Sequence, residues 1–105
     1  MGGVQVMEKI YISGKISGIP LEYAEPMFRF AKKEVTTYYF YNSAVIPLDL
    51  KPFLGLKNWW CHMISDLYAL SKCDAIFMLR NWKDSRGACV EHLYAVWTKK
   101  TIIYQ

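Results

Sequence analysis

The feature that most constrains the fold is an uninterrupted apolar run, Ala75-Ile76-Phe77-Met78-Leu79, which follows Asp74. A strand with one face in water alternates apolar and polar residues, whereas a strand covered on both faces is apolar throughout. A parallel sheet between two layers of helices gives a strand this kind of cover. The run therefore predicts a central strand over residues 74–79 of an α/β protein.

The segments around this run alternate between strand and helix patterns. Strands are predicted over residues 8–13, 44–48 and 101–104, and helices over about 20–38, 58–71 and 84–98. Pro26 is expected in or near the first turn of the first helix, because a deeper proline would interrupt the helical hydrogen bonds. Helical spacing places one apolar face of the second helix at Trp60, Met63, Ile64, Leu67 and Ser71.

This order predicts four parallel strands joined by right-handed crossovers, with helices on both faces of the sheet. The expected architecture is a flavodoxin- or Rossmann-like three-layer sandwich. The whole chain, residues 1–105, is expected to be a single domain with its core over about 8–104. Ligands of such sheets bind at the carboxyl ends of the strands, where the strand order reverses. That rule favours two loops as ligand sites, Ser13–Gly18 and Asn81–Gly87.

Composition excludes several classes of protein. The net charge is +4, but basic residues occur in pairs at most, such as Lys32-Lys33, and a nucleic-acid binder would show a denser stripe. No stretch approaches the ~20 apolar residues of a membrane span, and Met1–Val4 lacks the pattern of a secretory leader. We therefore expect a cytoplasmic protein that binds a small anionic molecule, and neither a nucleic-acid polymer nor a membrane.

The cysteines and aromatic residues add two further expectations. The 3 cysteines form no CxxC pair, which favours buried thiols in a reducing compartment over disulfides or a metal site. We expect no metal ion and no cofactor. Aromatic residues make up 16% of this small chain, which predicts a homo-oligomer that buries some of them. Trp59 and Trp82 are candidates to stack on a flat ligand, with core burial as the alternative.

Both loops could hold an anion. In the first, Gly14 and Gly18 would let backbone amides approach an anion, while Ser13, Lys15 and Ser17 add donors. The alternative is a tight strand-to-helix turn. In the second, Ser85, Arg86 and Gly87 open the third helix, whose N-terminus favours negative charge. The alternative there is a helix cap at Ser85 and a solvated Arg86.

Three further side chains are candidates for chemistry. Glu91 lies one and a half turns into the third helix, and its helical neighbours Ala88 and Ala95 are small enough to leave space beside the carboxyl. A solvated carboxylate is the alternative. Asp66 projects from the edge of the apolar stripe of the second helix, where burial would raise its pKa. Tyr11 lies in the first strand, and core packing is its alternative role.

These motifs occur in an order that resembles one known pattern. The chain begins with Lys9-Ile10-Tyr11-Ile12-Ser13-Gly14-Lys15-Ile16-Ser17-Gly18, continues with Ser65-Asp66-Leu67 and Cys73-Asp74-Ala75, and ends with Ser85-Arg86-Gly87-Ala88-x-x-Glu91. Over residues 8–104 it resembles the nucleoside 2-deoxyribosyltransferase-like superfamily. Within that superfamily it is most similar to a branch of small bacterial and phage domains of unknown function.

The resemblance implies a role for each of the three candidates. Glu91 would attack the anomeric carbon of the sugar, Tyr11 would orient Glu91, and Asp66 would handle the leaving base. Ser85 stands where relatives that act on unphosphorylated nucleosides carry an Asp. It resembles the branch that hydrolyses deoxynucleoside 5′-monophosphates, in which a Ser contacts the phosphate. The expected function is N-glycosidase or deoxyribosyltransferase chemistry on a nucleotide or nucleoside. The alternative is a non-catalytic module that binds or senses a nucleotide.

Overall fold

The computed structural model describes residues 8–105. The expectation about the leader at Met1–Val4 falls outside these residues. Among the described helices, none combines the length and the apolar character needed to cross a membrane.

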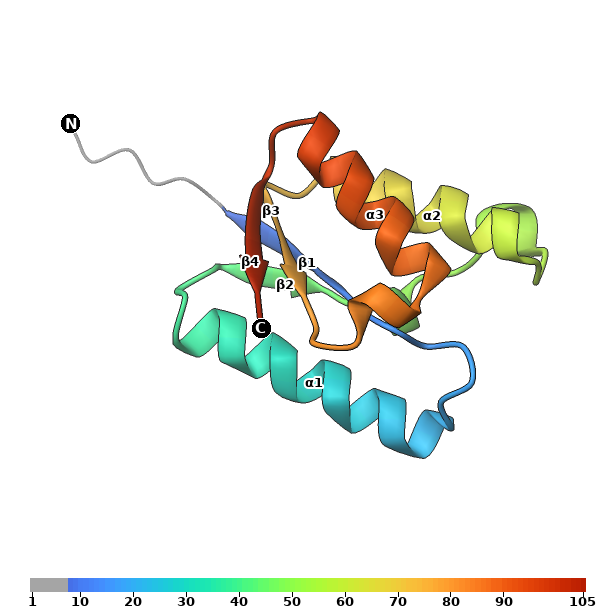
Figure 1. The fold of residues 1–105 in the computed structure, drawn as a ribbon, viewed down its shortest axis with the longest axis horizontal. Helices are drawn as coiled ribbons and strands as arrows, with labels where there is room; N and C mark the ends of the chain where they lie inside the picture. Colours follow the sequence, from blue (N-terminus) through green and yellow to red (C-terminus); the bar gives the residue numbers. More distant parts are fainter. Residues whose placement is uncertain (1–7) are drawn as a thin grey trace.

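Four parallel strands form one sheet in the order β2-β1-β3-β4 (Figure 1). They are β1 (Lys9–Ser13), β2 (Ser43–Val45), β3 (Ala75–Met78) and β4 (Thr101–Tyr104). β1 and β3 are central and in register, with Tyr11 opposite Ile76. All four residues of β3 are buried, so the central strand predicted from the apolar run is confirmed.

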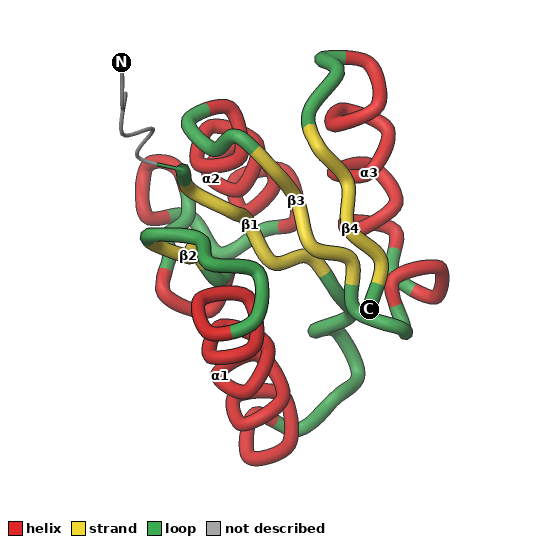
Figure 2. Tube along the Cα trace, turned by 90° about the vertical axis from the view of Figure 1, so that its left-hand side faces the viewer, coloured by secondary structure: helices red, strands yellow, loops and turns green. Residues whose placement is uncertain are grey.

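Three helices cover the sheet on its two faces, as Figures 1 and 2 show. α1 (Leu21–Thr37) packs on one face, where Phe28, Ala31 and Val35 meet Ile10 and Phe77. α2 (Trp59–Ser71) and α3 (Arg86–Trp97) lie side by side on the other face. There, Leu70, Ala88 and Ala95 meet Tyr11, Ile76 and Met78. The protein is therefore an α/β three-layer sandwich, as predicted.

The predicted apolar face of α2 is wrong in part. Trp60 is 71% exposed and Ile64 is 46% exposed, whereas Cys61, Met63 and Leu70 are buried. Apolar residues surround most of this helix, so their spacing alone did not single out the face that meets the sheet.

A turn that contains Pro47 follows β2 sooner than predicted, and Pro26 lies near the first turn of α1, as predicted. β2 ends at Val45 and a 3₁₀ turn, Pro47–Asp49, replaces the predicted strand end. Pro47 has no N–H to donate to a neighbouring strand, which accounts for the shortening. Pro26 is the sixth residue of α1 and thus lies in its second turn. The helix continues through it, and the burial of Ala24 and Phe28 on either side compensates for the missing hydrogen bond.

The strand order reverses between β1 and β3, and the loops that follow these two strands are tied together. The N–H of Lys15 donates to Oδ1 of Asn81 at 2.9 Å, and the N–H of Leu79 donates to the carbonyl of Ser13 at 2.8 Å. Gly14 packs so closely on Leu79 that a Cβ on Gly14 would lie 2.6 Å from Cδ1 of Leu79. These contacts fix the edge of the sheet at which ligands are expected.

Candidate functional site

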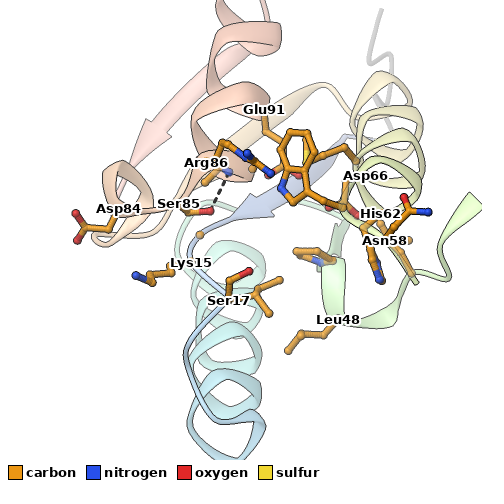
Figure 3. Close-up of a pocket in the computed structure, with 18 of the residues that line it drawn as sticks. Lys15, Ser17, Leu48, Asn58, His62, Asp66, Asp84, Ser85, Arg86 and Glu91 are labelled. Atoms are coloured by element: carbon orange, nitrogen blue, oxygen red, sulfur yellow. Dashed lines mark hydrogen bonds between the residues drawn. The ribbon is translucent and has the colours of Figure 1, made fainter. Parts of the chain in front are cut away.

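A pocket of about 610 Å³ opens at this edge (Figure 3). Its walls come from the loop after β1, the turn after β2 and the first turns of α2 and α3. The residues that line it are Gly14, Lys15, Ile16, Ser17, Pro47, Leu48, Leu50, Lys57, Asn58, Trp59, His62, Met63, Asp66, Asp84, Ser85, Arg86, Gly87, Ala88 and Glu91. The volume suits a ligand of nucleotide size.

Among the carboxyls that line the pocket, that of Glu91 is the most deeply buried. Only 3% of the residue is exposed, which excludes the alternative of a solvated surface carboxylate. The Tyr11 hydroxyl donates to Oε2 at 2.9 Å, and the Ser13 hydroxyl donates to Oε1 at 2.6 Å. Both oxygens are thus held from β1, while the neighbouring Ala88 borders the same pocket. The carboxyl has a fixed orientation toward a ligand-sized space.

Asp66 is the second carboxyl at this point of the pocket, and it is partly buried on α2. Burial, reinforced by the charge of Asp66, raises the pKa of Glu91 to about 8, although the hydrogen bonds from Ser13 and Tyr11 oppose the shift. Burial also raises the pKa of Asp66 to about 6, against the opposing effects of its hydrogen bond with Glu91 and the charge of His62. Between about pH 6 and about pH 8 the pair therefore holds one proton, which belongs to the two carboxyls together.

Two predicted site residues, Tyr11 and Ser13, hold the Glu91 carboxyl through hydrogen bonds. Tyr11 is fully buried, and burial together with the charge of Glu91 raises the pKa of its phenol well above the ordinary value. Ser13 is also fully buried, and its hydroxyl is directed to Glu91. The structure thus places Ser13 with the carboxyl rather than at the anion site predicted from its loop. Sequence spacing could not show this, because the partner lies 78 residues away.

The loop after β1 contributes only part of its predicted anion site. Gly14, Lys15 and Ser17 line the pocket, whereas Gly18 does not. Gly18 has φ +81°, so its role is to turn the chain into α1. The N–H of Lys15 is already bonded to Asn81, which leaves the Lys15 side chain as the donor this residue can offer an anion.

The first turn of α3 brings three predicted residues to the pocket. Ser85 is the N-cap, and its Oγ accepts a hydrogen bond from the N–H of Ala88 at 3.1 Å. The capping role considered from sequence is therefore confirmed, and the Ser85 hydroxyl can still donate its own proton. Arg86 and Gly87 also line the pocket. Their N–H groups belong to the first turn, where a helix has no carbonyl partners for them, so this end remains suited to an anion.

The two candidate stacking residues differ in position. Trp59 lines the pocket, and the guanidinium carbon of Arg86 lies 4.0 Å from the centre of the Trp59 ring. Trp82 stacks instead on His92, with ring centres 4.2 Å apart, at a place outside this pocket. Trp59 is therefore the one of the two that a ligand in the pocket can meet.

Several pocket residues were not predicted. His62 lies one helical turn before Asp66 on α2, and that spacing could have revealed it. Asn58 is the N-cap of α2, and the predicted start of that helix could have revealed it, whereas Lys57 comes from the irregular loop before it, where sequence pattern gives no signal. Asn81, which holds the first loop, would have needed knowledge of the strand order.

The three cysteines are free thiols. Within residues 8–105, no three His, Cys, Asp or Glu side chains gather as a metal site.

Comparison with known sequences adds a family to this geometry. Residues 8–104 match the family described as a domain of unknown function, DUF4406. A search of curated proteins finds no match.

Proposed function

The chain belongs to the DUF4406 family, and from the site it carries we propose that it is an N-glycosidase that removes the base from a nucleoside 5′-monophosphate. One observation carries the proposal. The buried Glu91 carboxyl is held by two hydroxyls on the wall of a pocket that also contains a second, partly buried carboxyl, Asp66. Paired carboxyls with separated pKa values suit a reaction that needs a nucleophile and an acid.

The single proton of the carboxyl pair supplies the acid. In the free protein Glu91 and Asp66 share this proton, and the deeper burial of Glu91 favours its neutral form. As positive charge develops on the sugar, the ionised form of Glu91 is favoured and the proton passes to Asp66. Asp66 then lies ready to protonate the leaving base, and Glu91 lies ready to attack.

In the first step, the bond between C1′ and the base nitrogen breaks, and its electron pair stays with the base. Asp66 gives its proton to the base, and an oxygen of Glu91 forms a bond to C1′. Tyr11 and Ser13 hold the attacking carboxyl in place.

In the second step, water attacks C1′ while Asp66 accepts a proton from that water. The bond from C1′ to Glu91 breaks, its electrons return to the carboxylate, and the pair again holds one proton. A second base in place of water would make the reaction a deoxyribosyl transfer.

The phosphate of the substrate fits the opposite end of the pocket. Lys15, Ser17 and Ser85 line the pocket together with the first turn of α3, and the exposed side chain of Arg86 can reach a phosphate bound there. A phosphate dianion gains from the positive end of a helix and from hydroxyl and cationic donors. This arrangement supports a place for the chain among nucleoside 2-deoxyribosyltransferase-like proteins that act on nucleotides. Such a substrate belongs to the cytoplasm.

Product analysis tests the proposal. The protein is incubated with ribo- and deoxyribonucleoside 5′-monophosphates and the matching nucleosides, and free base is measured by chromatography. We expect release from monophosphates by the wild type and by Glu22→Gln, an exposed carboxylate on α1 that serves as the matched control. Glu91→Gln should abolish release while thermal unfolding remains cooperative. Equal release by Glu91→Gln would refute the role of Glu91.

The second candidate function is a nucleotide-binding module without turnover. The burial of Glu91 favours it, because burial raises the pKa of this carboxyl and a neutral carboxyl can donate to a sugar hydroxyl rather than attack carbon. Ligand at 100 times Kd would raise the free energy of unfolding by roughly 2.7 kcal/mol. Such stabilisation with no free base after prolonged incubation would favour this function over the glycosidase.

A further inference from the structure

Arg86 rests on Trp59, which among residues 8–105 is the only Trp, Tyr or Phe that lines the pocket. Its guanidinium carbon is 4.0 Å from the centre of the Trp59 ring, and both residues line the pocket. Figure 3 shows Arg86 extending from the start of α3 toward α2. Trp60 packs at 80° to Trp59 with ring centres 4.9 Å apart, which helps to fix the indole. A base that stacks on the covered face must replace the guanidinium.

This contact is easily exchanged. Among residues 8–105, the ion pairs within 4.0 Å all involve Arg29, so Arg86 has no carboxylate partner there. A cation over an aromatic ring at an accessible site is held more weakly than a guanidinium bonded to phosphate through two charged hydrogen bonds. Arg86 is also the first residue of α3, beside Ser85 and the unpartnered N–H groups of the first turn. A phosphate at that turn lies within reach of the Arg86 side chain.

We propose that Arg86 makes the site specific for phosphorylated nucleosides by covering Trp59 until a phosphate draws it away. The base of the same substrate then stacks on the uncovered ring. A nucleoside without phosphate offers nothing to hold Arg86, so its base competes with the guanidinium for the indole. This inference rests on the proposed function for its choice of substrate, but the exchange on Trp59 is measurable without turnover.

Tryptophan fluorescence with inorganic phosphate as the probe tests the exchange. We expect a saturable change in emission in the wild type that is absent from both Trp59→Phe and Arg86→Ala. Arg86→Lys, which keeps the charge but loses the planar stack, should respond weakly. Trp97→Phe is the control, because Trp97 is 84% exposed on α3 and lies outside the pocket, and it should keep the response. A response that survives in Arg86→Ala would overturn the proposal.

Turnover gives the second measurement. Arg86→Ala should lower kcat/KM for the monophosphate by about 10- to 100-fold, the usual loss for a charged hydrogen bond. The value for the nucleoside should stay constant or rise, because Trp59 is uncovered. An equal fall for both substrates would show that Arg86 is merely structural, while the glycosidase stands. If no substrate turns over, the glycosidase fails, and the phosphate response of Trp59 still decides the role of Arg86.

Discussion

The hydroxyl of Tyr11 lies 2.9 Å from Oε2 of Glu91, and the two residues are 80 positions apart in the chain. Tyr11 is fully buried in the central strand β1, and Glu91 is nearly so on α3. The bond therefore ties the orientation of the carboxyl to the buried centre of the sheet. A nucleophile needs that kind of fixed approach to its target.

Tyr11→Phe should impair Glu91 without unfolding the domain. The Tyr11 hydrogen bond lowers the pKa of Glu91, so its loss raises that pKa and reduces the fraction of carboxylate. We expect kcat to fall by about 10-fold or more and the upper limb of the pH–rate profile to move to higher pH. Tyr94→Phe, on α3 and packed against the same core, is the control and should leave the profile unchanged. An unshifted upper limb in Tyr11→Phe would contradict this.

The pH dependence of kcat/KM should be bell-shaped, with limbs near pH 6 and pH 8, because this ratio reports the carboxyls of the free enzyme. Below about pH 6 both carboxyls are protonated and no carboxylate attacks, while above about pH 8 no proton remains for the base. In Asp66→Asn no carboxyl remains to protonate the base, so the upper limb should disappear and kcat should fall by about 10²–10⁴-fold. Steady-state rates across this range test it. Asp84→Asn, at the phosphate end of the pocket, should keep both limbs.

The stability of the free protein should fall as pH rises through the same range. The folded-state pKa of Glu91 is raised from 4.5 to about 8, so the folded chain holds a proton that the unfolded chain has released. The stabilisation is complete below the unfolded pKa and is lost as pH rises through about 8. Thermal unfolding should therefore give a lower Tm at pH 8 than at pH 6, and Glu91→Gln should flatten this slope. If Glu91→Gln left the change of Tm with pH the same, groups other than Glu91 would be responsible for that change.

Because Gly14 packs closely on Leu79, substitutions at these two positions should change the free energy of unfolding in a non-additive way. A Cβ at position 14 would lie 2.6 Å from Cδ1 of Leu79 and 2.9 Å from its Cβ, so Gly14→Ala should cost about 1–3 kcal/mol. Leu79→Ala removes the nearer of these two atoms, Cδ1. The double variant should therefore lose less free energy of unfolding than the two single variants together, by about 0.5 kcal/mol or more. Denaturant unfolding measures all three. Gly55→Ala, which has open space around it, should be additive with Leu79→Ala.

Much of the fold could be predicted from the sequence because buried segments are rich in apolar residues. The apolar run of β3 could be stable only between two layers, and β4 was predicted at the bounds observed, Thr101–Tyr104. The face of α2 was not predictable in the same way. Trp60 is apolar yet exposed, and only its neighbours in space decide that.

The candidate site was predicted in part for a related reason. Asp66, Ser85 and Glu91 became candidates through their positions on helices, and their proposed roles came from the order of motifs that resembles a known superfamily. Ser13 and Gly18 were misplaced, since one faces a partner far along the chain and the other is needed for its positive φ. The spacing of residues in the sequence predicts which of them share a face of a helix. It does not predict which residue of a distant element a loop residue will contact.

The 80 residues between Tyr11 and Glu91 also have a consequence for synthesis. β1, which carries Tyr11, leaves the ribosome long before Glu91 does, because Glu91 lies on α3, the last of the three helices. A nascent chain that stops before position 91 has neither the proposed nucleophile nor the cost of burying its carboxyl. Contacts of such long range form late in folding. Catalysis would therefore be a property of the finished domain, never of its fragments.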